Sequence, residues 1–167
     1  MTHVRTILGC FLCAIAAAAP AYAQDDAMNS VKGLPGVALV IEGLPDRSQN
    51  PEVITKEMVQ ADVEAQLRAA GIRVLTPAEV LRHPSKPSLV VNVAATHVPG
   101  DTYASMVLVS VRQWATLNSG QGLIVTTWQD GGAGWATAAT RVERERTLIG
   151  ETVAHFVNLW KFVNASK

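Results

Sequence analysis

Apolar residues recur at every second position along three runs in the middle of the chain, between residues 87 and 129. In the first run these are Leu89, Val91 and Val93, and the second run includes Val107 and Val109. A period of two is typical of strands that bury one face. Turn-forming residues separate the runs by connections too short for crossovers, which predicts an antiparallel meander. The predicted strands cover residues 89–96, 103–117 and 123–129.

The segment before this meander predicts a strand, a helix and a second strand. Residues 37–41 are almost continuously apolar, as in a central strand that is buried on both faces. Thr55 can cap a helix whose apolar residues recur at helical spacing up to Ala70, and Gly71 can end it. Residues 72–75 then predict a short strand, which together with the first strand and the helix forms a parallel crossover.

The carboxy-terminal segment, residues 141–163, predicts a long helix. Its apolar stripe includes Ile149, Val153, Phe156 and Trp160, all of which we expect to be buried against the sheet. Charges of both signs occupy the first turns, where pairs three or four residues apart on a solvated face add only about 0.2 to 0.5 kcal/mol each. We therefore interpret the charged positions as surface. They are Arg141, Glu143, Arg144, Glu145 and Arg146.

The resulting element order is β-α-β-(turn)-β-β-β-α, in which residues 76–81 form the turn, a short helical segment capped by Thr76 and Pro77. This order predicts an α+β two-layer sandwich, with a mixed sheet and both main helices on one face. We expect a single domain over residues 37–167, preceded by a polar, flexible arm over residues 24–36.

The first 23 residues have the parts of a secretory signal peptide. Arg5 precedes an apolar run, and Ala21 and Ala23 frame a small-x-small cleavage site, so we expect the mature chain to begin at Gln24. The apolar run is shorter than the roughly 18 to 20 residues that a membrane anchor needs. An alternative is a lipoprotein cut before Cys10. The expected location is periplasmic or secreted.

Cleavage after Ala23 removes both cysteines, Cys10 and Cys13, so the mature domain is expected to lack disulfides. The formal net charge is zero, with 14 basic and 14 acidic residues, which favours neither nucleic acid nor an anionic membrane as a partner. No histidine or carboxylate cluster has metal-ligand spacing, and no catalytic constellation is evident. We therefore expect no metal, no cofactor and no enzymatic activity.

The sheet face opposite the core is the first candidate for binding. By alternation it carries Arg112, Trp114 and Trp128, residue types that are enriched at binding hot spots. A purely structural alternative is that the two tryptophans cover each other. Gly-rich residues 129–135 predict a loop, in which Trp135 either packs back onto the domain or contacts a partner.

These features predict a non-catalytic binding or accessory module of the bacterial cell envelope, which acts on a protein partner or forms a homodimer. The alternative is a small-molecule-binding protein or enzyme with its pocket between the open sheet face and the loop over residues 131–135.

Several short segments can be compared with known groups of proteins: residues 54–57, 70–76, 103–106, Thr127 with Trp128, Gly131 with Gly134, and Phe156 with Asn158. Together they resemble a group of uncharacterised secreted bacterial proteins. The resemblance spans most of the mature chain but implies no activity. The order of elements is also similar to that of the amino-terminal domain of TolB and of CsgG-like modules of envelope assemblies, a likeness of architecture that does not determine function.

Overall fold

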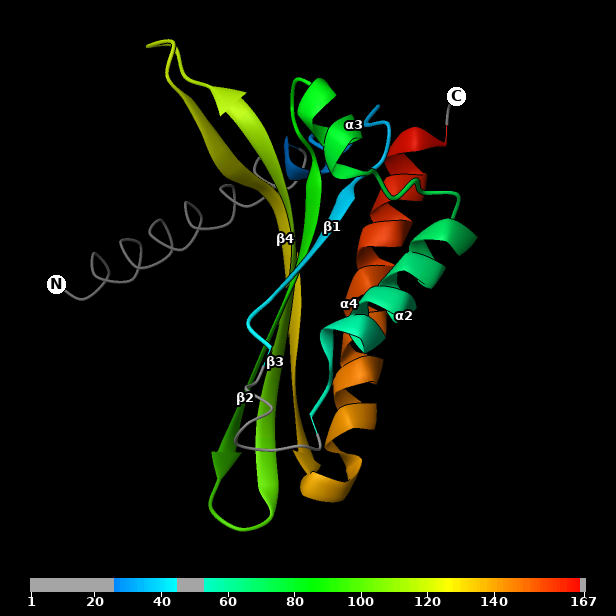
Figure 1. The fold of residues 1–167 in the computed structure, drawn as a ribbon, viewed down its shortest axis with the longest axis vertical. Coiled ribbons are helices and arrows are strands. Elements are labelled where there is room, and N and C mark those ends of the chain that lie inside the picture. The colour runs from blue at the N-terminus through cyan, green and yellow to red at the C-terminus, as the bar shows by residue number, and fades with distance from the viewer. Residues whose placement is uncertain (1–25, 45–52, 166–167) are drawn as a thin grey trace, which may run out of the picture.

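The computed structural model describes residues 26–44 and 53–165, and it has the predicted α+β architecture (Figure 1). The predicted signal peptide over residues 1–23 lies outside the described residues. The elements are β1 (Ala38–Glu42), α2 (Lys56–Ala69), α3 (Pro77–Arg82), β2 (Ser88–Val98), β3 (Thr102–Thr116), β4 (Gly122–Thr137), a 3-10 turn η1 (Ala138–Thr140) and α4 (Arg141–Asn164).

The sheet is mixed, with the strand order β1-β2-β3-β4. β1 pairs with β2 in parallel, and the remaining pairs are antiparallel, which confirms the predicted meander. The prediction that residues 37–41 form a central strand was wrong, because β1 lies at the edge of the sheet and Val40 is 37% exposed. The segment 72–75 contributes only one parallel bridge, between Val74 and Val37, so the predicted strand does not form there.

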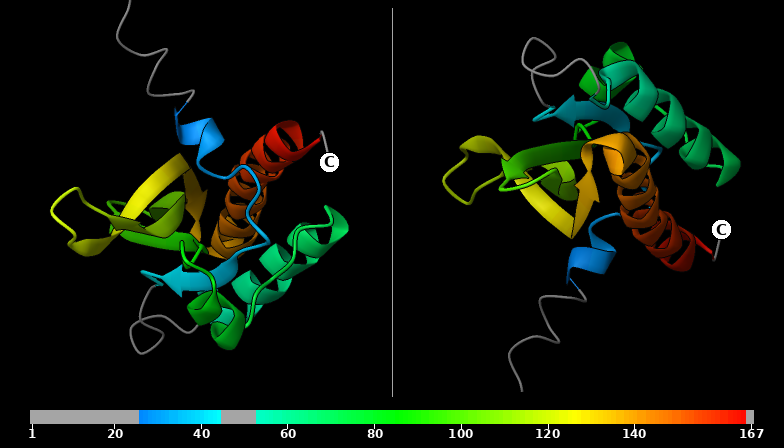
Figure 2. Two further views of the ribbon diagram at one scale, coloured as in Figure 1. Left: turned by 90° about the horizontal axis from the view of Figure 1, so that it is seen from above. Right: turned by 90° about the horizontal axis from the view of Figure 1, so that it is seen from below.

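Both main helices cover the same face of the sheet, as predicted (Figure 2). Thr55 caps α2 by accepting a hydrogen bond from the Met58 N–H, and Gly71 follows the helix with a positive φ of 74°. The core between the sheet and the helices is aliphatic and closely packed. Its buried members include Val59, Val63 and Leu67 of α2, Leu89, Val91 and Val93 of β2, Val107, Val109 and Val111 of β3, and Ile149, Val153 and Phe156 of α4.

Phe156 occupies the centre of an aromatic row in this core. Its ring centroid lies 5.6 Å from that of Trp128 on β4 and 5.8 Å from that of Trp160, one helical turn further along α4. Of the four stripe residues predicted to be buried, Trp160 is only half-buried, because it lies near the end of the helix.

Residues 26–36 belong to the folded domain rather than to a flexible arm. They begin with a helical turn over residues 26–29, and Val31 and Leu34 are buried in the core. The Gly33 N–H donates to Oδ1 of Asn164, 2.8 Å away at the end of α4. The prediction of an arm rested on polar composition, and it overlooked that two apolar side chains are enough to anchor such a segment against a helix.

The glycine-rich residues 131–134 are also not a loop, because β4 continues through them to Thr137 while paired with β3. A Cβ atom at Gly132 would stand 2.7 Å from Cδ1 of Leu148, so the absence of a side chain lets α4 lie close to the strand. Glycine at position 132 therefore suits the packing of α4 on the strand, although its strand propensity is low.

Candidate binding site

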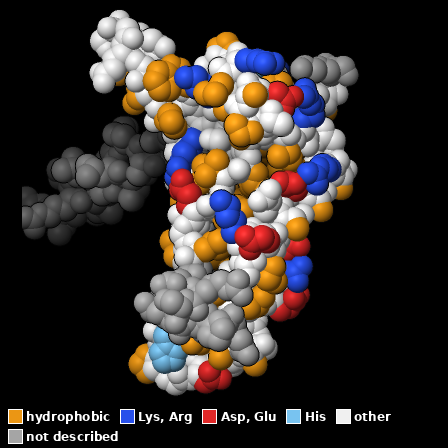
Figure 3. All heavy atoms as spheres, viewed as in Figure 1, with side chains coloured by type: hydrophobic (Ala, Val, Ile, Leu, Met, Phe, Trp, Pro, Cys, Tyr) orange, Lys and Arg blue, Asp and Glu red, His pale blue; other side chains and the backbone are white. Residues whose placement is uncertain are grey.

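The open face, the sheet surface that α2 and α4 leave uncovered, carries exposed apolar side chains. Trp114 and Ile124 are cross-strand partners close to the end of the β3–β4 hairpin, where they are 38% and 66% exposed. This hairpin projects beyond the helices at the upper left of Figure 1, and hydrophobic side chains reach its surface in Figure 3. Further exposed apolar residues of the open face are Val40 and Met106.

Arg112 lies on the open face, as predicted, but its guanidinium group is already paired. Its Nη1 and Nη2 donate to the two carboxylate oxygens of Glu42, at 3.0 and 3.2 Å. This bidentate pair joins β3 to β1 across β2, above Val90, which is buried. Arg112 therefore connects strands within the sheet, and each partner keeps more than a third of its side chain exposed.

Trp114 is held at the surface by two contacts. Its ring lies against Gly122, where a Cβ atom would stand 2.1 Å from Cζ2, so only glycine fits beneath it. The ammonium of Lys86 lies 4.5 Å from the ring centroid, within the range of a cation–π contact. The indole is thus presented in a defined position, which lowers the entropy lost when a partner covers it.

Trp128 lies on the helix side of the sheet, so the prediction that it shares the open face with Arg112 and Trp114 was wrong. The register of β3 and β4 shifts between Val111 and Arg112. Val111 pairs with Trp128, whereas Arg112 pairs with Thr126. One extra residue in β4, at position 127, reverses the face of every side chain beyond it.

A polar network stabilises this bulge. The side-chain amide of Gln113 donates to Oγ1 of Thr127 at 2.8 Å and to the Ser30 carbonyl at 2.9 Å. Ser30 Oγ, which donates to the Ala27 carbonyl at 2.7 Å, also lies 3.3 Å from the Thr127 carbonyl. The segment before β1 therefore holds the bulge from outside the sheet, which explains why the sequence of β4 alone did not reveal it.

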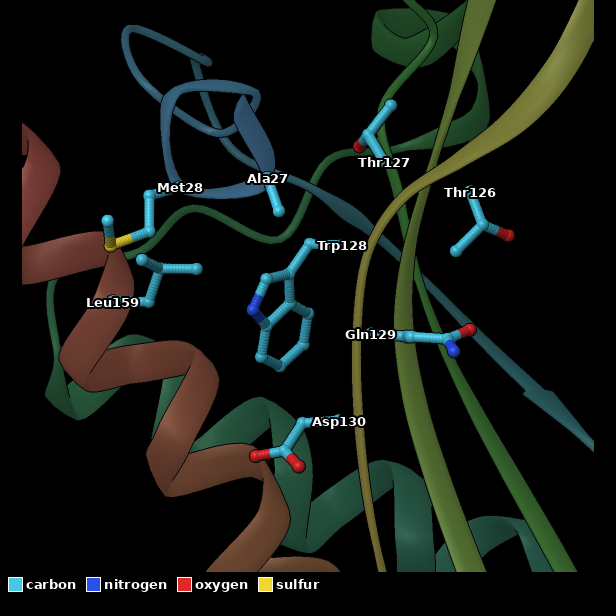
Figure 4. Close-up of a pocket in the computed structure, with 8 residues that line it drawn as sticks. All are labelled: Ala27, Met28, Thr126, Thr127, Trp128, Gln129, Asp130 and Leu159. Carbon is cyan, nitrogen blue, oxygen red and sulfur yellow. The ribbon is translucent and has the colours of Figure 1, made fainter. Parts of the chain in front are cut away.

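A hollow of about 670 Å³ opens beside Trp128 (Figure 4). In Figure 4 the indole stands between β4 and α4, with Met28 and Leu159 at one side and the Asp130 carboxylate at the other. The pocket of the alternative hypothesis was expected on the opposite side of the sheet, beside a loop that does not form. The residues lining the hollow are Ala27, Met28, Thr126, Thr127, Trp128, Gln129, Asp130 and Leu159.

Asp130, at one end of this hollow, already has hydrogen-bond partners. Its Oδ2 lies 2.6 Å from Nδ1 of His155, and its Oδ1 accepts a 2.7 Å bond from the Gly131 N–H. The carboxylate is thus tied to α4 and to its own strand.

Trp135 is exposed by 69% and lies beside a second, smaller hollow of about 340 Å³. The first turns of α4 supply the other wall. The lining residues are Trp135, Ala139, Thr140, Glu143, Arg144 and Thr147. Both hollows therefore adjoin β4, one near each end of its glycine-rich part.

Arg141 and Glu145, predicted as surface residues, are buried instead. Glu145 is fully buried, and its Oε1 accepts 2.8 Å bonds from Arg141 Nε and Ser105 Oγ, while its Oε2 has no hydrogen-bond partner among the described residues. The Arg141 guanidinium also lies 4.6 Å from the ring centroid of Tyr103. The sequence spacing could have predicted this burial, since Glu145 and Arg141 lie four and eight residues before Ile149 and so continue the apolar stripe of α4.

This cluster does not form a recognisable catalytic centre. Ser105 donates to a carboxylate, and the nearby His97 contacts Tyr103 edge to face, with ring centroids 5.1 Å apart. Among the described residues no group of three or more His, Cys, Asp or Glu side chains is placed to hold a metal ion.

No protein-family model matches the sequence, and no curated protein is similar to it. A weak structural match is a minor lipoprotein from Acinetobacter baumannii, with 11% identity, a TM-score of 0.31, and coverage of 72% of this chain and 87% of that one. Neither the family models nor the curated proteins support the resemblance to TolB and CsgG-like modules. Within the described residues no helix has the length and hydrophobicity to cross a bilayer.

Proposed function

We propose that the protein is a non-catalytic binding module exported to the bacterial cell envelope, and that it contacts a protein partner through the open face at the β3–β4 hairpin. The supporting observation is the exposed pair of Trp114 and Ile124 on a hairpin that projects beyond the helices. Exposed aromatic and aliphatic groups that adjoin one another are typical of interaction surfaces.

The proposed export rests on the amino-terminal pattern, with cleavage between Ala23 and Gln24 and a periplasmic or secreted location. Mass spectrometry of protein purified from the periplasm measures the amino terminus directly. A chain that begins at Gln24 is the expected result. A lipid-modified Cys10 as the first residue would instead indicate a membrane-anchored lipoprotein.

Site-specific photo-crosslinking in the native host tests the binding surface. A photoreactive residue at Ile124 is expected to form a discrete adduct, either with a second copy or with another envelope protein. The matched control is the same residue at Leu81, a comparably exposed apolar position on α3, 72% exposed. Trp114→Ser is expected to abolish the Ile124 adduct while the thermal melt of the domain stays near that of the wild type.

The proposal is refuted if Ile124 gives no adduct, or the same adducts as Leu81. A Trp114→Ser variant that melts far below the wild type would assign Trp114 to a structural role. In that event, the adduct formed at Ile124 in the protein that retains Trp114 still shows whether the hairpin binds a partner.

A further inference from the structure

β4 is an edge strand along its 16 residues, and part of that edge is unprotected. Among the described residues, no backbone hydrogen bond joins residues 131–135 to any segment other than β3. No charged residue and no proline occurs from position 131 to position 140. Natural proteins usually shield such edges with charges, prolines or a covering segment, because an open edge pairs with other chains.

The two hollows adjoin this open edge, one beyond each end of the glycine run. Trp128 lines one hollow and Trp135 lines the other, and the two residues lie seven positions apart in the strand. At about 3.4 Å per residue, an added strand of roughly seven residues spans the distance between them. Gly131, Gly132 and Gly134 present no side chain between the hollows, so a backbone can approach β4 closely there.

The two hollows differ in whether their charged side chains are already paired. In the hollow beside Trp128 the carboxylate of Asp130 is satisfied by His155, and the walls formed by Met28 and Leu159 are apolar. This hollow therefore suits an apolar side chain.

In the hollow beside Trp135, Arg144 is half-buried and has neither an ion pair nor a hydrogen bond with the described residues. Its Nε lies 3.2 Å from where a Cβ of Gly134 would stand, so the guanidinium lies directly over the strand. A partly desolvated cation without a counter-ion favours an incoming carboxylate. Glu143, the other charged residue of this hollow, is exposed and opposes an anion.

We infer that the edge of β4 binds an extended segment of another protein, which adds to the sheet as a fifth strand. Main-chain hydrogen bonds to residues 131–135 supply affinity, as in other cases of strand addition. Specificity comes from an apolar side chain in the hollow at Trp128 and a carboxylate that pairs with Arg144. This site is separate from the hairpin surface of the proposed function, which lies at the opposite end of β4.

The test is selection of peptides from a displayed library of random decapeptides on the full-length exported protein. Selected peptides are expected to combine an acidic residue with an apolar one about six positions away, because Trp128 and Gly134, which Arg144 covers, lie on the same face of β4. The best synthetic peptide then serves as the probe in fluorescence polarisation and in NMR. Its amide shifts are expected at residues 131–135, and Arg144→Ala is expected to weaken its binding about tenfold.

The matched control is Arg68→Ala, which removes an exposed arginine from α2, where it pairs with Glu64. Glu143→Gln is expected to strengthen binding, because it removes the opposing charge. The inference is overturned if no peptide is enriched, if Arg144→Ala binds as tightly as Arg68→Ala, or if the shifts fall on the hairpin. A dimer in sedimentation that the peptide dissociates would also overturn it. Each of these results leaves the Ile124 crosslinking test unaffected.

Discussion

The buried ion pair of α4 permits a quantitative test of how this domain is stabilised. In Glu145→Leu the Arg141 guanidinium, whose side chain is only 4% exposed, loses its counter-ion, and Ser105 Oγ loses its acceptor. Removing one partner of a buried pair costs about 3 to 5 kcal/mol. This is a large share of the roughly 5 to 15 kcal/mol that stabilises a typical domain.

Urea unfolding followed by circular dichroism measures the loss. With a denaturant slope of about 1 to 3 kcal/mol per molar urea, the midpoint is expected to fall by roughly 1 to 5 M. The exposed pair between Arg146 and Asp62 provides the control, because Asp62→Leu is expected to cost less than about 1 kcal/mol. The double variant Arg141→Leu with Glu145→Leu is expected to recover most of the loss, because no uncompensated charge then remains.

Two results would refute this reasoning. If Glu145→Leu is as mild as Asp62→Leu, the buried charge of Arg141 is stabilised by other means, such as its contact with Tyr103. If the double variant is as unstable as Glu145→Leu alone, the loss arises from packing rather than from the unpaired charge.

Two further predictions concern a glycine and a helix cap. Gly132→Ala is expected to lower the free energy of unfolding by about 1 to 3 kcal/mol, because the new methyl group meets Leu148. Gly150→Ala is expected to raise the free energy of unfolding by up to about 1 kcal/mol, because Gly150 has open space around it. Equal effects in urea unfolding would contradict the close approach of helix and strand. The second prediction concerns the pKa of Glu79, which is lowered mainly by the hydrogen bond from the Thr76 backbone N–H. Its stabilisation of α3 is therefore present above the ordinary glutamate pKa and is lost as the pH falls through the lowered value. An NMR titration in which Glu79 titrates at or above an ordinary glutamate would contradict this.

Local patterns were sufficient for most of the secondary structure. The alternation in residues 89–96 and 103–117 predicted β2 and β3, because one face of each strand had to be apolar. Thr55 and Gly71 predicted the ends of α2, since capping depends on a few neighbouring residues. The exposed position of Trp114 followed from the same alternation.

The faces and the burial of several key residues depended on contacts between distant segments. Ser30 and Gln113 hold the bulge at Thr127, which turns Trp128 toward Phe156 and away from the predicted surface. A one-residue change of register leaves the sequence pattern of a strand almost unaltered but exchanges its two faces.

Burial and pairing likewise outweighed local preference at the other end of β4. The glycines of residues 131–134 have low strand propensity, yet they form a strand because they pair with β3, and Gly132 leaves room for Leu148 of α4. Arg141 and Glu145 read as surface charges, but they neutralise each other and can therefore be buried together beneath the helix. The sequence alone determined most of the helices and strands, and the tertiary structure decided which side chains of those segments meet solvent, because burial depends on what packs opposite them.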